Sequence, residues 1–225
     1  MLRRMIGPVI FGLGGVAILL ALGFWQLGRL EWKLGVIAQI EARLRETPSR
    51  LPATVDPGQD RYRAVFVDGD YTGESVAVLS TWPGVGVGVE VIAVLALADG
   101  RRVLGDRGFV RLARRAGLDL AATGVRVQGN LLWPEDQSGA TPPPDLARGL
   151  WFSRAVGPIA AHLGTEPVLI VARTDAPLPG LMPRPIDTAD VKNDHLGYAV
   201  TWFLLALVWA GMTGFLLWRI RRNTA

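Results

Sequence analysis

Residues Leu196–Trp218 read LGYAVTWFLLALVWAGMTGFLLW, a run of 23 residues without a charged side chain. A helix rises about 1.5 Å per residue, so this run is long enough to cross the roughly 30 Å hydrocarbon core of a bilayer. A second uncharged run, Met5–Leu27, lies near the other end of the sequence. Helices buried in soluble cores rarely carry uncharged runs of this length. We therefore expect two transmembrane helices, at residues 5–27 and 196–218.

The distribution of charge predicts the orientation of these helices. Five arginines flank the two runs on their outer sides, at positions 3, 4, 219, 221 and 222, and the rest of the chain holds 19 basic against 20 acidic residues. Short flanks rich in arginine stay in the cytoplasm. We expect residues 1–4 and 219–225 to be cytoplasmic tails beside the membrane lipid. The sequence pI of about 10.1 reflects these tails, so we exclude nucleic acid as a partner.

The first run has a second interpretation, a cleaved signal peptide. Arg3 and Arg4 precede an apolar segment, and Ala21–Gly23 resembles a small-residue cleavage site. The run continues past that site into Phe24 and Trp25 and is longer than a typical signal core. These features favour an uncleaved anchor, and the second span is expected in either case.

The region between the spans predicts an amphipathic helix at residues 28–46 and a β-rich domain at residues 47–195. Short alternating runs indicate strands that are mainly antiparallel, with a barrel-like arrangement among the options. Asp99-Gly100 predicts a hairpin, and Asp68-Gly69-Asp70 predicts an exposed turn. Val156–Leu163 predicts a short helix ended by Gly164. Residues 176–185, rich in proline, predict an extended connector back to the membrane. The fold class is thus an α+β membrane protein with two terminal transmembrane helices.

Few residues in the domain indicate chemistry. The chain has no cysteine and two histidines, which excludes thiolate metal sites and leaves too few histidines for a multi-histidine site. It contains no G-x-x-x-x-G-K-[ST], H-E-x-x-H or G-x-S-x-G motif, so we do not expect an enzyme. Six arginines could hold anionic groups such as propionates, but a solvated strand face explains them better: they are Arg101, Arg102, Arg107, Arg111, Arg114 and Arg115.

The second span begins with a histidine. Helical offsets of three, four and seven place His195, Tyr198, Trp202 and Trp209 on roughly one stripe. An imidazole at the outer end of a span is tolerated there and can ligate a planar amphipathic group lying half in lipid. The alternative is an interfacial aromatic belt with a hydrogen-bonded histidine at the helix start, and the residues alone do not decide between them.

Four motifs occur in order along the chain. The first is Trp-Gln-x-x-Arg-x-x-Trp-Lys, and the last is Asn-x-His-Leu-x-Tyr-Ala-x-Thr-Trp. Between them lie a strand pair with an Arg-Gly-aromatic turn and a Trp-Phe step. In this sequence they occupy Trp25–Lys33, Val103–Val110, Trp151-Phe152 and Asn193–Trp202. Together they resemble the motifs of the Surfeit locus protein 1 family of cytochrome c oxidase assembly factors.

The resemblance implies a membrane-bound biogenesis factor that assists binding of haem a and its insertion into oxidase subunit I, and not an enzyme. It implies that His195 is a ligand of the haem iron, with Trp202 beside the porphyrin. Tyr198, on the same stripe, is expected to shape the pocket together with Trp202. The implied partners are oxidase subunit I and haem a synthase. The arginine flanks and a short N-terminal tail without an organelle-targeting segment favour a bacterial inner membrane, with the central domain in the periplasm. A scaffold or chaperone that stabilises subunit I without binding haem is the alternative.

Overall fold

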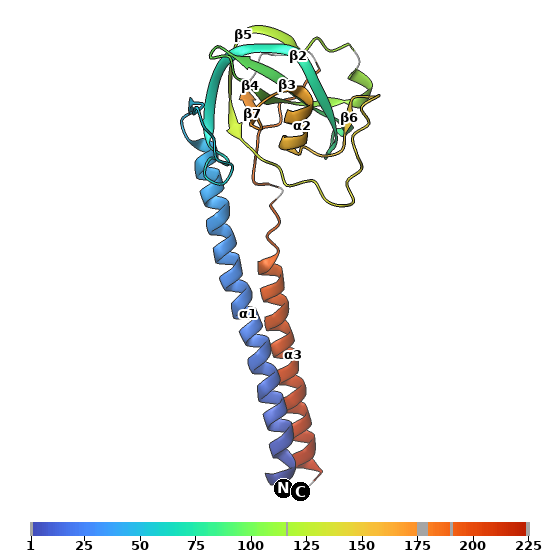
Figure 1. Ribbon diagram of the computed structural model, residues 1–225. Coiled ribbons are helices and arrows are strands. Elements are labelled where there is room, and N and C mark those ends of the chain that lie inside the picture. The colour runs from blue at the N-terminus through green and yellow to red at the C-terminus, as the bar shows by residue number, and fades with distance from the viewer. Residues whose placement is uncertain (1, 116, 175–179, 190, 224–225) are drawn as a thin grey trace. The chain divides into compact units, whose positions relative to one another are not determined.

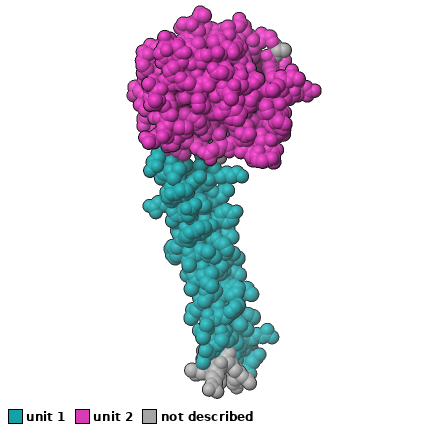
Figure 2. All heavy atoms as spheres, viewed as in Figure 1, with its two compact units in different colours: residues 1–39, 188–225 teal, residues 40–187 magenta. Residues whose placement is uncertain are grey.

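The computed structural model describes residues 2–115, 117–174, 180–189 and 191–223 (Figure 1). Residues 1 and 224–225 of the expected tails, and residues 176–179 of the expected connector, lie outside the described residues. The chain forms two compact units, which Figure 2 colours separately. One comprises residues 1–39 with 188–225, and the other comprises residues 40–187.

The first unit is a pair of long helices. α1 spans Leu2–Arg45 without a break, and its last residues, from Ile40, belong to the second unit. α3 spans His195–Arg222. Both are long and apolar enough to cross a membrane, and only 6% of the most suitable window of each is buried. The low burial is unlike that of a core helix of a soluble domain and is consistent with two membrane-spanning helices.

The two helices run antiparallel, and small residues let them approach closely. On α3, half-buried and buried positions recur four and three residues apart, the spacing of coiled-coil seams; they are His195, Ala199, Trp202, Ala206, Trp209 and Thr213. On α1, a Cβ atom at Gly15 would overlap Trp209, and one at Gly12 would overlap Thr213. Glycines thus leave room on α1 for the side chains of α3, as is common between membrane helices.

A third glycine lies nearer the start of α3. A Cβ atom added to Gly23 would lie 2.5 Å from the ring of Phe203. That ring also meets Phe24 edge-on at 5.3 Å between centroids, a favourable geometry for two aromatic rings. Three separate contacts along the seam therefore fix the register of α1 against α3.

The second unit contains a seven-stranded sheet and the short helix α2, Val156–Leu163 (Figure 1). Its strands are β1 Ser49–Arg50, β2 Ala64–Trp82, β3 Gly86–Leu97, β4 Arg102–Arg111, β5 Ala121–Leu131, β6 Leu150–Trp151 and β7 Leu169–Thr174, and a 3-10 turn, η1, follows β4 at Leu112–Arg114. The strand order is β1-β2-β3-β4-β7-β5, and the first part of β2 also pairs with β5.

The sheet is mixed, which corrects the expectation of a barrel-like domain, whereas the longer strand pairs are antiparallel as expected. β2, β3 and β4 form antiparallel pairs, as do β5 and β7. β1–β2, β2–β6 and β4–β7 are parallel. Parallel neighbours are joined by long connections, and local hairpin signals carry no information on them. Two local expectations are confirmed: the Asp99-Gly100 hairpin between β3 and β4, and α2, which ends in the left-handed Gly164.

The expectation of a turn at Asp68-Gly69-Asp70 is wrong, because these residues lie within β2, a continuous strand of 19 residues. Asp68 forms an ion pair with Arg126 at 2.6 Å, and the N–H of Gly124 donates to Asp70 at 2.6 Å. Gly69 is needed because a Cβ atom there would overlap the carbonyl of Ala96 on β3. The glycine thus allows a close approach of β3 at the point where β2, still paired with β5, begins to pair with β3 as well.

The expected solvated arginine face is also corrected at one position. Arg107 is fully buried, lies over the ring of Tyr71 at 4.0 Å from its centroid, and donates to the carbonyl of Leu120 at 2.8 Å. The next residue, Gly108, has a φ of 113°, and a Cβ there would overlap the backbone of Met182. Met182 pairs with Phe109 as an isolated bridge. The Arg-Gly-aromatic motif therefore holds the described part of the connector against β4.

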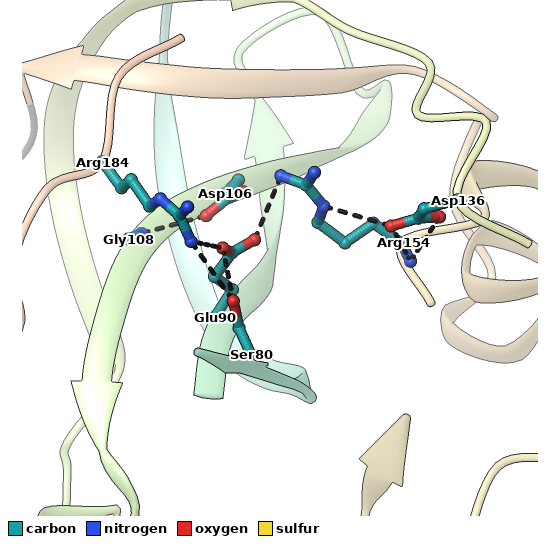
Figure 3. Close-up of polar contacts among 7 residues, drawn as sticks. All are labelled: Ser80, Glu90, Asp106, Gly108, Asp136, Arg154 and Arg184. Atoms are coloured by element: carbon teal, nitrogen blue, oxygen red, sulfur yellow. Dashed lines mark hydrogen bonds and ion pairs between the residues drawn. The ribbon is translucent and has the colours of Figure 1, made fainter. Parts of the chain in front are cut away.

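A buried polar network supports the same contact (Figure 3). Glu90 and Asp106 are each 3% exposed. Arg184 of the connector donates to Glu90 at 2.7 Å, and Ser80 donates to the same oxygen at 3.1 Å. Arg154 lies 3.1 Å from the other oxygen of Glu90 and also pairs with Asp136. Two carboxyl groups and two guanidinium groups thus share one buried space.

Within this network, burial raises the pKa of Asp106 to about 7, and the neighbouring charge of Glu90 adds to the rise. Arg154, the N–H of Gly108 and Arg184 oppose it. Between pH 4 and 7 the folded state therefore keeps a proton that the unfolded state releases. The free energy of unfolding falls as the pH rises through this window and stays at its lower value above it.

We expect Asp106→Asn to make the free energy of unfolding less dependent on pH between pH 4 and 7. Each pKa unit corresponds to about 1.4 kcal/mol, and the folded state keeps the extra proton over about two pH units between pH 7 and pH 5. The wild type should therefore gain at most about 3 kcal/mol relative to Asp106→Asn between pH 8 and pH 5. Pulse proteolysis of the full chain in detergent along a urea series measures the difference. Asp119→Asn is the control, since Asp119 accepts an N–H two residues on, as Asp106 does, but is exposed. An identical pH dependence of unfolding in wild type and Asp106→Asn would contradict the raised pKa of Asp106.

We expect Gly15→Leu to destabilise the helix pair by about 1–3 kcal/mol, the usual cost of forcing extra atoms into a packed site. Gly14→Leu is the matched control, because a Cβ at Gly14 has nothing within 4 Å. Unfolding of the purified chain by titration with SDS, followed by tryptophan fluorescence, compares the two variants. Equal stability would show that the glycine contacts do not hold α1 against α3.

Candidate functional site

His195 is the first residue of α3 and is half-buried. Asp194 precedes it as the N-cap, but its side chain makes no capping hydrogen bond. The backbone carbonyl of Asp194 instead accepts the N–H of Tyr198 at 3.2 Å. The imidazole of His195 follows this N-cap and lies at the end of the apolar part of the helix.

The imidazole of His195 meets a side chain from α1. Its Nδ1 lies 2.8 Å from Oε1 of Gln26, a residue 169 positions earlier in the chain. Nε2 of His195 makes no hydrogen bond within the part of the chain that the structure describes. A neutral imidazole has one donor nitrogen and one acceptor nitrogen. When Nδ1 carries the proton and donates to the amide oxygen, Nε2 presents a lone pair for a metal ion.

The other two residues expected at the site lie differently. Trp202 is half-buried and occupies the same seam as His195, two helical turns along α3. Tyr198 is 57% exposed. The seam position between His195 and Trp202 is filled by Ala199, which is 1% exposed. His195, Trp202 and Trp209 thus share one side of α3, and Tyr198 lies outside the contact with α1.

His195, Trp202 and Tyr198 are the residues that would hold a haem at this end of α3. An imidazole nitrogen is a common protein ligand of haem iron. The half-buried Trp202 offers a flat apolar surface on the same helix, and the exposed Tyr198 offers a ring with a hydroxyl that reaches polar surroundings. Bound haem would supply the porphyrin and its iron, while the chain supplies one nitrogen ligand and aromatic surface. The described residues contain no group of three or more metal-binding side chains.

A separate hollow lies towards the other end of the helix pair. This groove has a volume of about 770 Å³ and is mostly apolar, with Phe11, Trp209, Phe215 and Arg219 among its lining residues. Trp209 is 14 residues from His195 along α3, or about 21 Å at the helical rise. The groove and the histidine are therefore two different features.

Gln26 is the residue of this site that sequence reasoning did not single out. It belongs to the Trp-Gln-x-x-Arg-x-x-Trp-Lys motif, but its partner lies at the far end of the chain. One local signal was present, because Gln26 is the only amide side chain in the uncharged run Met5–Leu27. A polar side chain in a membrane span usually faces a partner helix.

Comparisons with known proteins agree with the motifs. The model of the SURF1 family matches residues 13–207. A SURF1-like protein of Monosiga brevicollis is 31% identical over 214 residues, covering 87% of this chain and 82% of the relative. Surfeit locus protein 1 of Homo sapiens is 28% identical over 210 residues, covering 82% of this chain and 69% of the relative. A SURF1-like protein of Caenorhabditis elegans is 27% identical over 218 residues, covering 84% of this chain and 67% of the relative.

The match includes most of α1, slightly less than half of α3 and the whole described sheet between them. It also includes Gln26, His195 and Trp202, the half-buried side chains of the candidate site. A family model that covers so much of the chain in one continuous stretch decides its membership. The chain belongs to the SURF1 family.

Proposed function

We propose that this protein is a membrane-bound assembly factor for cytochrome c oxidase that assists the binding of haem a and its insertion into subunit I. The single observation that carries the proposal is the geometry of His195. Its Nδ1 is engaged by Gln26, whereas its Nε2 makes no hydrogen bond among the described residues. An imidazole in this state is a ready ligand for haem iron.

The helix pair suits the amphipathic character of haem a. His195 lies at the end of an apolar helix, where a porphyrin can place its apolar tail among lipid and its propionates near water. Trp202 and Tyr198 supply aromatic surface on the same helix. The chain's own part in the proposed function is to bind, orient and release the group; no covalent bond is made or broken by its side chains.

The proposed surroundings follow from charge. Residues 1–4 and 219–225 carry the basic excess and would stay in the cytoplasm, which places residues 47–195 on the opposite side of a bacterial inner membrane. The proposed partners are oxidase subunit I and haem a synthase. The second unit offers them a folded domain whose connector is fastened to the sheet at Met182 and Arg184.

One observation favours a second function, a scaffold that holds subunit I without binding haem. Two of the aromatic side chains of α3 are occupied in packing, since Trp209 lies against Gly15 and Phe203 against Gly23. In this alternative the aromatic residues serve helix packing alone, and His195 serves only to hydrogen-bond Gln26.

The two functions differ in the haem content of the purified protein. We expect full-length protein from cells that make haem a to show a porphyrin spectrum. The haem content of His195→Ala should be at least about tenfold lower, because the side chain that would bind the iron is removed. His162→Ala is the matched control, because His162 is exposed on α2 and contacts Trp151.

Equal haem content in His195→Ala and His162→Ala would remove His195 from the mechanism. Wild-type protein that is purified without pigment but still retains subunit I would favour the scaffold. Absorbance spectra of the reduced pyridine complex, together with the recovery of subunit I, distinguish these outcomes.

A further inference from the structure

We propose that Gln26 is a positioning residue, which holds the imidazole of His195 in the tautomer and orientation that leave Nε2 as the ligand atom. This inference rests on the proposed haem-binding function and adds to it a contribution from α1. The candidate ligand and its positioning residue thus come from opposite ends of the chain, and the site forms only when the two long helices pair.

The first step is the chemistry of the contact. The 2.8 Å separation between Nδ1 of His195 and Oε1 of Gln26 is a hydrogen-bond distance. The amide oxygen can only accept, so Nδ1 must carry the proton. In a neutral imidazole Nε2 is then unprotonated. Histidines that bind metals commonly donate their other N–H to a carboxylate or carbonyl group, which fixes the ring in this way.

The second step is rigidity. Gln26 lies one helical turn beyond Gly23, where α1 and α3 meet through Phe203. The T-shaped contact of Phe24 with Phe203 lies beside it. A side chain this close to a packed contact has little freedom to leave its partner. The glycine contacts therefore determine where the amide oxygen lies relative to the imidazole.

The third step is the environment. Gln26 is half-buried within the uncharged run of α1, where water offers little competition for its hydrogen bonds. Leaving a buried polar group without a partner costs about 1–3 kcal/mol. Both side chains therefore favour the paired arrangement. An uncharged amide also makes the imidazole a weaker electron donor than a carboxylate partner would, which suits a ligand that has to release its haem.

The test begins without haem, in the full-length protein in nanodiscs with ¹⁵N-labelled histidine. The chain has only His162 and His195, so NMR resolves both rings. We expect His195 in the wild type to be protonated on Nδ1, the less common tautomer of a free imidazole. Gln26→Leu, which removes the acceptor at similar volume, should convert His195 to the Nε2–H tautomer and leave His162 unchanged.

Gln39→Leu is the matched control, because it makes the same change at an exposed position of α1. Gln26→Glu retains an acceptor and should retain the Nδ1–H tautomer. A wild-type His195 protonated on Nε2, with the amide NH₂ of Gln26 donating to Nδ1, would overturn the inference. So would a tautomer that Gln26→Leu does not change.

The second arm titrates the same proteins with haem a. We expect Gln26→Leu to weaken binding by 10- to 100-fold, the usual effect of removing such a partner, and Gln39→Leu to bind like the wild type. Equal affinity of Gln26→Leu and wild type would overturn the positioning role while the proposed function stands. A wild type that binds no haem would remove the proposed function itself, and the NMR arm still decides the state of His195.

Discussion

The close approach of α1 and α3 is the constraint on which the candidate site depends. Gly12, Gly15 and Gly23 leave no side chain on α1 where Thr213, Trp209 and Phe203 come in from α3. Without these gaps the helices could not meet in this register. His195 and Gln26 are separated by 169 positions in the chain, so only the pairing of the helices brings them within 2.8 Å. The contact that orients His195, the proposed haem ligand, thus depends on the packing of α1 against α3.

Hydropathy and local signals predicted much of the fold. The uncharged runs correspond to α1 and α3, since a run of that length has few alternatives. Gly164 and Asp99-Gly100 each mark a feature that depends only on neighbouring residues, and both were predicted. The expectation of a turn at Asp68–Asp70 was wrong because Gly69 serves a close contact with Ala96, a residue far along the chain that the pairing of β2 with β3 brings near. The parallel strand pairs were missed for the same reason.

The candidate site divides in a similar way. His195 and Trp202 were found by helical spacing and by resemblance, because both lie on one helix. Spacing also placed Tyr198 on that stripe, but 57% of it is exposed and Ala199 takes the seam position. Gln26 was missed because its role depends on a partner at the far end of the chain. Arg107 was expected on a solvated face, yet the ring of Tyr71 accommodates its charge in the interior.

The register of the helix pair can be measured directly, because the chain contains no cysteine. A Cβ atom at Gly12 would lie 3.0 Å from Cβ of Thr213, close to the roughly 3.5–4.5 Å that a disulfide spans. We therefore expect Gly12→Cys with Thr213→Cys to cross-link rapidly in native membranes. Gly14→Cys with Thr213→Cys should not, since nothing lies within 4 Å of that position. Equal cross-linking of the two pairs, or none in either, would contradict the pairing on which the site depends.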